Sequence, residues 1–166
     1  NMTMERVKLL LEAESGGGKT SCLAHLVNAG YRLFILDFDN NTRVIRKFLK
    51  NQADWDTHVH IKSFNTLDDL RQGTQTRSLV PGKLKEILNG DFVDNFGVSH
   101  GKTLDLTVKD VLVVDTGTFM GRVFMRDALL RYRSKEFPNG YDPEEVGTFD
   151  RSVYGSAQHK FDVVLQ

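Results

Sequence analysis

The segment Ala13–Thr20, which reads AESGGGKT, constrains the fold of this chain more than any other feature. Its three consecutive glycines stand between a short apolar run, Val7–Leu11, and a segment that begins at Lys19 with apolar residues at helical spacing. Small residues let the backbone N–H groups of such a loop turn inward around an anion. The start of the following helix directs the positive end of its dipole to the same place. The segment therefore predicts a buried strand, a phosphate-binding loop and a helix, in that order.

The same segment fits the Walker A pattern, with Ala13 in the position of the first glycine. In this pattern the Lys19 ammonium reaches the β- and γ-phosphates of ATP, and the Thr20 hydroxyl is a ligand of Mg²⁺. A flexible glycine-rich turn between a strand and a helix is the simpler alternative. The predicted nucleotide-binding residues are Ser15, Gly16, Gly17, Gly18, Lys19, Thr20 and Ser21.

A second Gly-Lys-Thr tripeptide, Gly101–Thr103, tests how specific this pattern is. The Walker A spacing would place Phe96 in the first position, where the loop needs a small residue. The residues that follow, Leu104–Thr107, alternate between apolar and polar side chains and are not typical of a helix. We therefore predict no phosphate site at this second tripeptide.

An aliphatic run, Val111–Val114, ends in Asp115 and matches the Walker B pattern. Ligands of open α/β sheets bind at the carboxyl ends of the strands, which is where this carboxylate is expected. Asp115 is then predicted to hold Mg²⁺ through a water molecule, opposite Thr20. The alternative is a strand that is followed by an ordinary polar turn residue.

Two further carboxylates follow the apolar run Leu33–Leu36, at Asp37 and Asp39. A carboxylate at this edge of the sheet could orient or deprotonate the water that attacks the γ-phosphate. We favour Asp39 as this base and keep Asp37 as the alternative, although Asp is also common in solvated turns. The predicted catalytic residues are Lys19, Asp39 and Asp115.

Predicted strands alternate with predicted helices along the chain, which favours an α/β fold with a parallel sheet covered by helices. Val59–Phe64 is a further predicted strand, and short helices are predicted at Leu67–Leu70 and Leu84–Leu88. Longer helices are predicted at Lys19–Ala29, Phe119–Tyr132 and Val153–Leu165. A further helix is predicted to be capped by Thr42, and its apolar face is formed by Val44, Ile45, Phe48 and Leu49. We expect one domain over residues 1–166 that lacks its C-terminal strands, because no predicted strand follows the last helix.

The composition narrows the classes of partner. Lys and Arg together number 22, as do Asp and Glu, so the formal net charge is zero and any nucleic-acid surface must be local. One cysteine, Cys22, excludes an intramolecular disulfide and favours a reducing compartment. No apolar run approaches the ~20 residues that a membrane-spanning helix needs.

With these motifs in place, the chain resembles the RecA-like ATPases, and most closely the phage-encoded AAA-type, RecA-like ATP-binding proteins of recombination and replication modules. The resemblance implies Mg²⁺-dependent ATP hydrolysis in the cytoplasm, the host's if the chain is phage-encoded, by a homo-oligomer in which a neighbouring subunit supplies an arginine. RecA proteins carry a catalytic Glu where this chain has the shorter Asp39, so low turnover is expected. The matching segments are Leu9–Thr20, Leu33–Asn40, Val111–Thr118 and Tyr154–Gln158.

In RecA the segment between the Walker B strand and the next helix holds a DNA-binding loop, and residues 134–153 occupy that place here. Basic groups beside aromatic ones suit single-stranded DNA, which binds through phosphate contacts and base stacking. A solvated loop explains the segment equally well, because Asp142, Glu144 and Glu145 dilute its charge. The residues concerned are Arg131, Arg133, Lys135 and Arg151, with Phe137, Tyr141 and Phe149.

Two other classes of function share these features. One is a nucleotide-dependent DNA-annealing or assembly module with little turnover, and the other is a small-molecule or nucleotide kinase. A kinase would need an arginine-bearing lid and a substrate pocket, and the aliphatic strand that ends in Asp115 favours an ATPase over a kinase.

Overall fold

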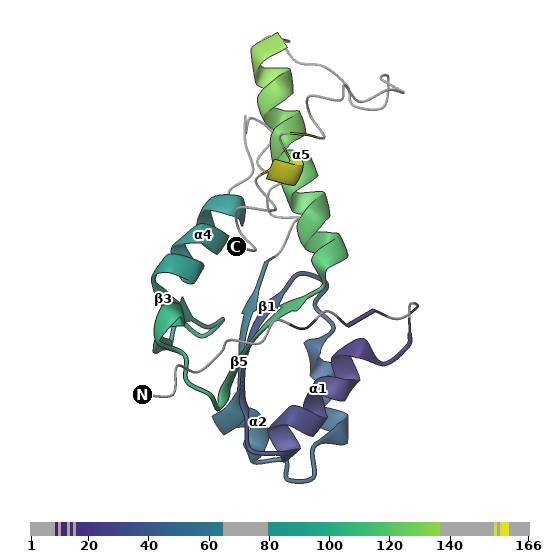
Figure 1. Cartoon of the computed structure of the whole chain (residues 1–166), viewed down its shortest axis with the longest axis vertical. Coiled ribbons are helices and arrows are strands. Elements are labelled where there is room, and N and C mark those ends of the chain that lie inside the picture. The colour runs from purple at the N-terminus through teal and green to yellow at the C-terminus, as the bar shows by residue number, and fades with distance from the viewer. Residues whose placement is uncertain are drawn as a thin grey trace.

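The computed structural model describes residues 9, 11–12, 14, 16–64, 80–136, 155 and 157–159, with the backbone alone at residues 119 and 129–136. Helices and strands alternate through the first half of this part of the chain, and Figure 1 shows their arrangement. The elements are α1 (Lys19–Asn28), β1 (Arg32–Asp37), the 3₁₀ helix η1 (Thr42–Phe48), α2 (Asp54–His58), β2 (Val59–Ser63), α4 (Val80–Asn89), β3 (Asp91–Val93), β4 (Ser99–Lys102), the 3₁₀ helix η2 (Thr103–Asp105), β5 (Asp110–Asp115) and α5 (Gly117–Glu136).

Three of the strands form a parallel sheet in the order β2-β1-β5, and helices flank it. This confirms the predicted α/β class with a parallel sheet. Asp37 at the end of β1 lies opposite Ser63 of β2 on one side and Asp115 of β5 on the other. The register therefore brings two of the predicted carboxylates together at the carboxyl edge of the sheet.

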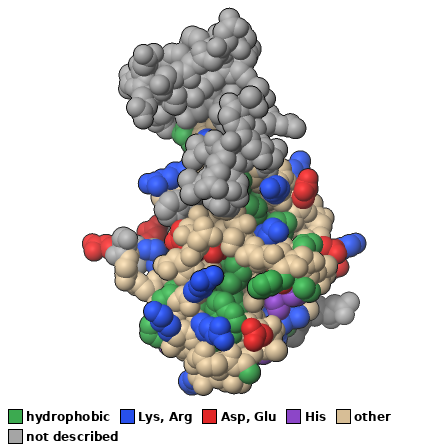
Figure 2. All heavy atoms as spheres, turned by 180° about the vertical axis from the view of Figure 1, so that it is seen from behind, with side chains coloured by type: hydrophobic (Ala, Val, Ile, Leu, Met, Phe, Trp, Pro, Cys, Tyr) green, Lys and Arg blue, Asp and Glu red, His purple; other side chains and the backbone are tan. Residues whose placement is uncertain are grey.

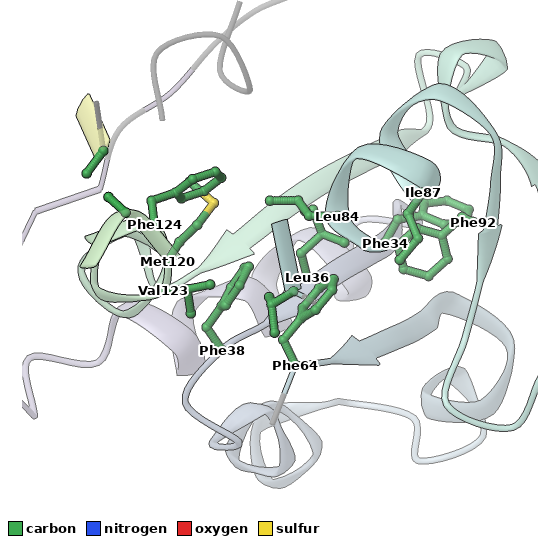
Figure 3. Close-up of a cluster of buried hydrophobic side chains, with 13 residues drawn as sticks. Phe34, Leu36, Phe38, Phe64, Leu84, Ile87, Phe92, Met120, Val123 and Phe124 are labelled. Carbon is green, nitrogen blue, oxygen red and sulfur yellow. The ribbon is translucent and has the colours of Figure 1, made fainter. Parts of the chain in front are cut away.

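The core has two parts, one on each face of the sheet. Because β1 is the middle strand, its residues Leu33–Asp37 are at most 1% exposed, and its side chains alternate between the two faces. Leu33 and Ile35 pack toward α1 and η1, whereas Phe34 and Leu36 pack toward α4 and α5. Figure 3 shows the second cluster, in which side chains of α4, α5 and β1 meet. Burial on both faces explains why β1 is a continuous apolar run.

A small antiparallel hairpin, β3–β4, lies outside the parallel sheet and was not predicted. The Asp94 carboxylate forms its turn by accepting hydrogen bonds from the N–H groups of Phe96 (2.8 Å) and Val98 (2.9 Å). Asn95 joins the turn to the edge of β2, because its N–H donates to the Ile61 carbonyl and its side chain bonds with Ser63. The turn of the hairpin is therefore hydrogen-bonded to the outer edge of β2 and covers it.

The second Gly-Lys-Thr tripeptide ends this hairpin. Lys102 is the last residue of β4, and the 3₁₀ turn η2 follows it in place of an α-helix. The tripeptide therefore lies at the end of a strand and is not followed by the α-helix that a Walker A segment precedes.

Several predictions about individual elements are wrong. Leu9 and Leu11 are 79% and 46% exposed and lie in no strand, contrary to the buried strand predicted at Val7–Leu11, whose other residues lie outside the described ones. The helix predicted from Thr42 is a 3₁₀ helix, and Phe48 is 56% exposed. The backbone becomes extended at Leu49, so Leu49 enters the core in place of Phe48.

The helices of the second half are longer than predicted. α4 begins at Val80, with Pro81 in its first turn, where a proline needs no N–H partner. α5 continues to Glu136, so residues 134–136 are helical and not part of a loop. Of the last predicted helix, residues 155 and 157–159 are helical, and Ala157 is buried. The short helix at 67–70 and the remainder of the 134–153 loop lie outside the described residues.

None of the helices in the described ranges is both long and apolar enough to cross a membrane.

Candidate functional site

The turn before α1 is shaped by its glycines. Gly16 and Gly18 both have φ of +78°, a left-handed conformation that a side chain disfavours. The Gly17 N–H donates to the Glu14 carbonyl at 3.0 Å, which closes the turn. Gly18 is the N-cap residue of α1 and provides no side-chain cap. The N–H groups of the first turn are therefore suitably placed for an anionic ligand.

The two predicted metal ligands are in direct contact. The Thr20 hydroxyl donates a hydrogen bond of 2.8 Å to the Asp115 carboxylate, which joins the start of α1 to the end of β5. Thr20 is 8% exposed and Asp115 is 6% exposed, so this bond is formed inside the protein. Residues that are 95 positions apart in the sequence thus form one buried polar pair at the carboxyl edge of the sheet.

Lys19 is folded back on the glycine-rich turn. Its ammonium donates a hydrogen bond of 3.0 Å to the Glu14 carbonyl, in an exposed position. Burial raises the pKa of Asp115, and the positive charge of Lys19 is the smallest of the effects that act on it and opposes the rise. Lys19 is the residue directly before Thr20 in the first turn of α1.

Negative charge is concentrated at this edge. Burial raises the pKa of Asp115 above its ordinary value; the Thr20 hydrogen bond opposes this rise, and the charges of Asp39 and Asp37 add to it. Burial also raises the pKa of Asp37. Ionised carboxylates that are buried and close together are unfavourable. A bound cation would stabilise them, because its positive charge offsets their mutual repulsion.

The two candidate bases have different surroundings. Asp37 is 1% exposed and accepts hydrogen bonds from the Thr42 hydroxyl and from the N–H groups of Asn40 and Asp39. Asp39 is half-buried and accepts one, from the Asn41 N–H at 3.0 Å. Donors of the protein thus occupy both oxygen atoms of Asp37, and Asp39 is the more exposed carboxylate of the two.

The other predicted binding residues divide as follows. The Ser21 hydroxyl donates to the Gly18 carbonyl at 2.9 Å and so helps to hold the turn. Ser15 lies outside the described residues.

In the described part of the chain, no group of three or more His, Cys, Asp or Glu side chains is arranged to hold a metal ion. The donor set at this edge is a hydroxyl and a carboxylate, which suits Mg²⁺ because that ion takes few protein ligands and completes its shell with water and phosphate oxygens.

Sequence reasoning missed the part that Thr42 plays. Thr42 was predicted to cap a helix, but its hydroxyl bonds the Asp37 carboxylate at 2.9 Å, and its side chain is 3% exposed. The signal was a hydroxyl five residues after a strand-terminal carboxylate, which is too common a pattern to be specific.

The chain matches no protein-family model, no curated protein and no solved structure.

Proposed function

We propose that this protein binds ATP with Mg²⁺ at the carboxyl edge of its sheet and hydrolyses it slowly, as a RecA-like P-loop ATPase. The observation that carries the proposal is the 2.8 Å hydrogen bond between Thr20 and Asp115. It brings the hydroxyl of the glycine-rich motif and the carboxylate of the aliphatic strand to one point, as a shared Mg²⁺ site requires.

The roles of the residues follow from their positions. The N–H groups of Gly16–Thr20 would surround the β-phosphate, and Gly16 and Gly18 supply the left-handed backbone for this. The Lys19 ammonium would exchange the Glu14 carbonyl for the β- and γ-phosphates. Thr20 and Asp115 would hold Mg²⁺, which when bound neutralises charge on the phosphate oxygens.

In the hydrolytic step, a water oxygen forms a bond to the γ-phosphorus while the bond from that phosphorus to the β–γ bridging oxygen breaks. Asp39 accepts the proton that the water loses, and ADP leaves with the bridging oxygen, its charge balanced in part by Lys19. The Asp39 carboxylate already accepts the Asn41 N–H. This contact, and a side chain one carbon shorter than Glu, support slow turnover.

A nucleotide-dependent binding module is the second candidate for the same reason, since a weak base leaves nucleotide binding intact. For either function, the proposal includes a role in phage recombination or replication through single-stranded DNA. It also includes assembly into a homo-oligomer. The DNA contact would involve the region around residues 134–153. On the face seen in Figure 2, Lys and Arg side chains lie among exposed apolar ones, with Asp and Glu side chains interspersed.

Single-turnover release of phosphate from Mg²⁺-ATP, with and without single-stranded DNA, tests this proposal. We expect slow release that DNA accelerates and that Asp39→Asn reduces at least 10-fold. Release that DNA leaves unchanged would remove the DNA part of the proposal. Nucleotide binding without release would favour the binding module, and transfer of the phosphate to an added acceptor would favour a kinase.

A further inference from the structure

Asp37 is a buried carboxylate that the proposed hydrolysis does not use. It ends β1, lies opposite Asp115 in the sheet and is 1% exposed. Burial of a carboxylate is unfavourable unless hydrogen bonds compensate for the lost water. Three donors do so, and all of them come from the next five residues: the N–H of Asp39 at 3.3 Å, the N–H of Asn40 at 2.8 Å and the hydroxyl of Thr42 at 2.9 Å.

These three bonds fix the segment that connects β1 to η1. Asn40, in the middle of it, has φ of +60°, so the chain turns sharply there. At the start of the segment, the Phe38 N–H donates to the Asp115 carbonyl at 2.6 Å. The Phe38 ring stacks on Phe64, with ring centroids 4.7 Å apart, and Figure 3 shows the pair within the core. Both ends of the segment are therefore held by buried contacts.

Asp39 lies between these two anchors. Its side chain is half-buried, and the hydrogen bond that it accepts comes from the same turn, from the Asn41 N–H. It follows Phe38, whose N–H is bonded to the Asp115 carbonyl, so the backbone of Asp39 lies beside the end of β5. The turn thus holds Asp39 next to that strand end while the Asp37 carboxylate accepts the donors of the turn.

We propose that Asp37, together with Thr42, is a positioning residue that holds the 38–42 turn so that Asp39 faces the reacting phosphate. This inference rests on the proposed function. Asp37 accepts no proton from the water; it acts through Asp39, so its loss should reduce the rate of hydrolysis and leave nucleotide affinity almost unchanged, because the phosphate contacts come from the loop before α1.

The experiment measures kcat, KM and the affinity for a fluorescent ATP analogue in six variants. Asp37→Asn and Thr42→Val should each lower kcat about 10-fold or more, with affinity within about 3-fold of wild type. Thr42→Ser keeps the hydroxyl and should restore kcat. Thr103→Val is the matched control, because Thr103 is also a buried threonine, 7% exposed, whose hydroxyl donates to the Ile87 carbonyl beside α4. It should leave kcat unchanged.

The double variant Asp37→Asn/Asp39→Asn separates positioning from general structural damage. If Asp37 acts through Asp39, the double variant is no slower than Asp39→Asn alone. Additive losses, or a parallel loss of affinity in Asp37→Asn, would overturn the inference. So would a Thr42→Val variant with the kcat of wild type.

Hydrogen exchange provides a readout that does not depend on activity. The amides of Asp39 and Asn40 should exchange faster in Thr42→Val than in wild type or Thr103→Val, and unchanged protection would contradict the inference. Failure of the proposed function has a different signature, which is a wild-type protein that does not bind the ATP analogue at all. A wild type that binds the analogue without hydrolysing ATP would favour the binding module and would overturn the positioning role.

Discussion

His60 makes the stability of this protein depend on pH between about 4 and 6.5. It lies in β2, is 9% exposed and has its ring centroid 3.9 Å from that of His100 in the hairpin. Burial lowers the pKa of His60 from 6.5 to about 4, with further lowering by the charges of His100, Arg32 and His58, and Asp94 opposes it. The folded protein therefore resists a proton that the unfolded chain accepts.

The sign and size of the effect follow by linkage. Above pH 6.5 the ring is neutral in both states and folding carries no penalty. Between pH 6.5 and about 4 the unfolded chain binds a proton that the folded state does not, so stability is lost as the pH falls. At about 1.4 kcal/mol for each pH unit, the full loss is about 3 kcal/mol, of which about 2 kcal/mol is lost by pH ~4.5.

Urea denaturation of wild type and His60→Phe at pH 7 and pH 4.5 measures this loss. The phenylalanine keeps a ring against His100 and removes the titration, so the variant should lose about 2 kcal/mol less than wild type over this range. His25→Phe, at an exposed position of α1, is the control and should behave as wild type. Equal pH dependence in wild type and His60→Phe would refute the reasoning, since the other titrating groups are shared.

Three further predictions concern the site and the hairpin. Asp115→Asn should raise the free energy of unfolding measured in urea at pH 7, because it removes a buried carboxyl group whose pKa burial raises, yet it should abolish Mg²⁺-dependent ATP binding; a destabilised variant would contradict this. Gly18→Ala should cost about 1 kcal/mol by thermal melting, because φ is +78° and the new Cβ would lie 3.3 Å from the Ser21 hydroxyl; an unchanged melting temperature would show a different turn. Asn95→Ala should cost about 1 kcal/mol and speed exchange of the Ser63 amide, whose partner it removes; unchanged exchange would refute the docking role.

The sequence predicts those parts of the fold in which the pattern of apolar residues is regular along the whole element. β1 and β5 are short aliphatic runs that end in Asp37 and Asp115, and the carboxyl ends of neighbouring parallel strands meet at one edge of a sheet. That rule alone brings the two carboxylates together. α1 follows from helical spacing after a glycine-rich turn, and its observed bounds, Lys19–Asn28, agree with the prediction to within one residue.

The parts that were missed depend on single side chains that bond to distant or local backbone. The sequence of the β3–β4 hairpin does not alternate between apolar and polar residues. The hairpin is held by the Asp94 carboxylate, which accepts hydrogen bonds from two N–H groups of its own turn and is hydrogen-bonded to the His100 ring. The exposure of Phe48 could not be read from spacing either, since it depends on where a 3₁₀ helix gives way to extended backbone. In the site, the Thr42 hydroxyl donates a hydrogen bond to Asp37 and helps to make its surroundings different from those of Asp39. Side-chain hydrogen bonds of this kind leave no periodic pattern in the sequence.

Calorimetric titration of Mg²⁺-ATP into wild type, Lys19→Ala and Lys102→Ala tests the central claim most directly. The two lysines occupy the same Gly-Lys-Thr sequence, but Lys19 begins a helix after a glycine-rich turn and Lys102 ends the strand β4. The proposed site predicts binding to wild type and Lys102→Ala, with a loss of at least 10-fold in affinity for Lys19→Ala. Equal affinity in all three proteins, or no binding by wild type, would contradict it.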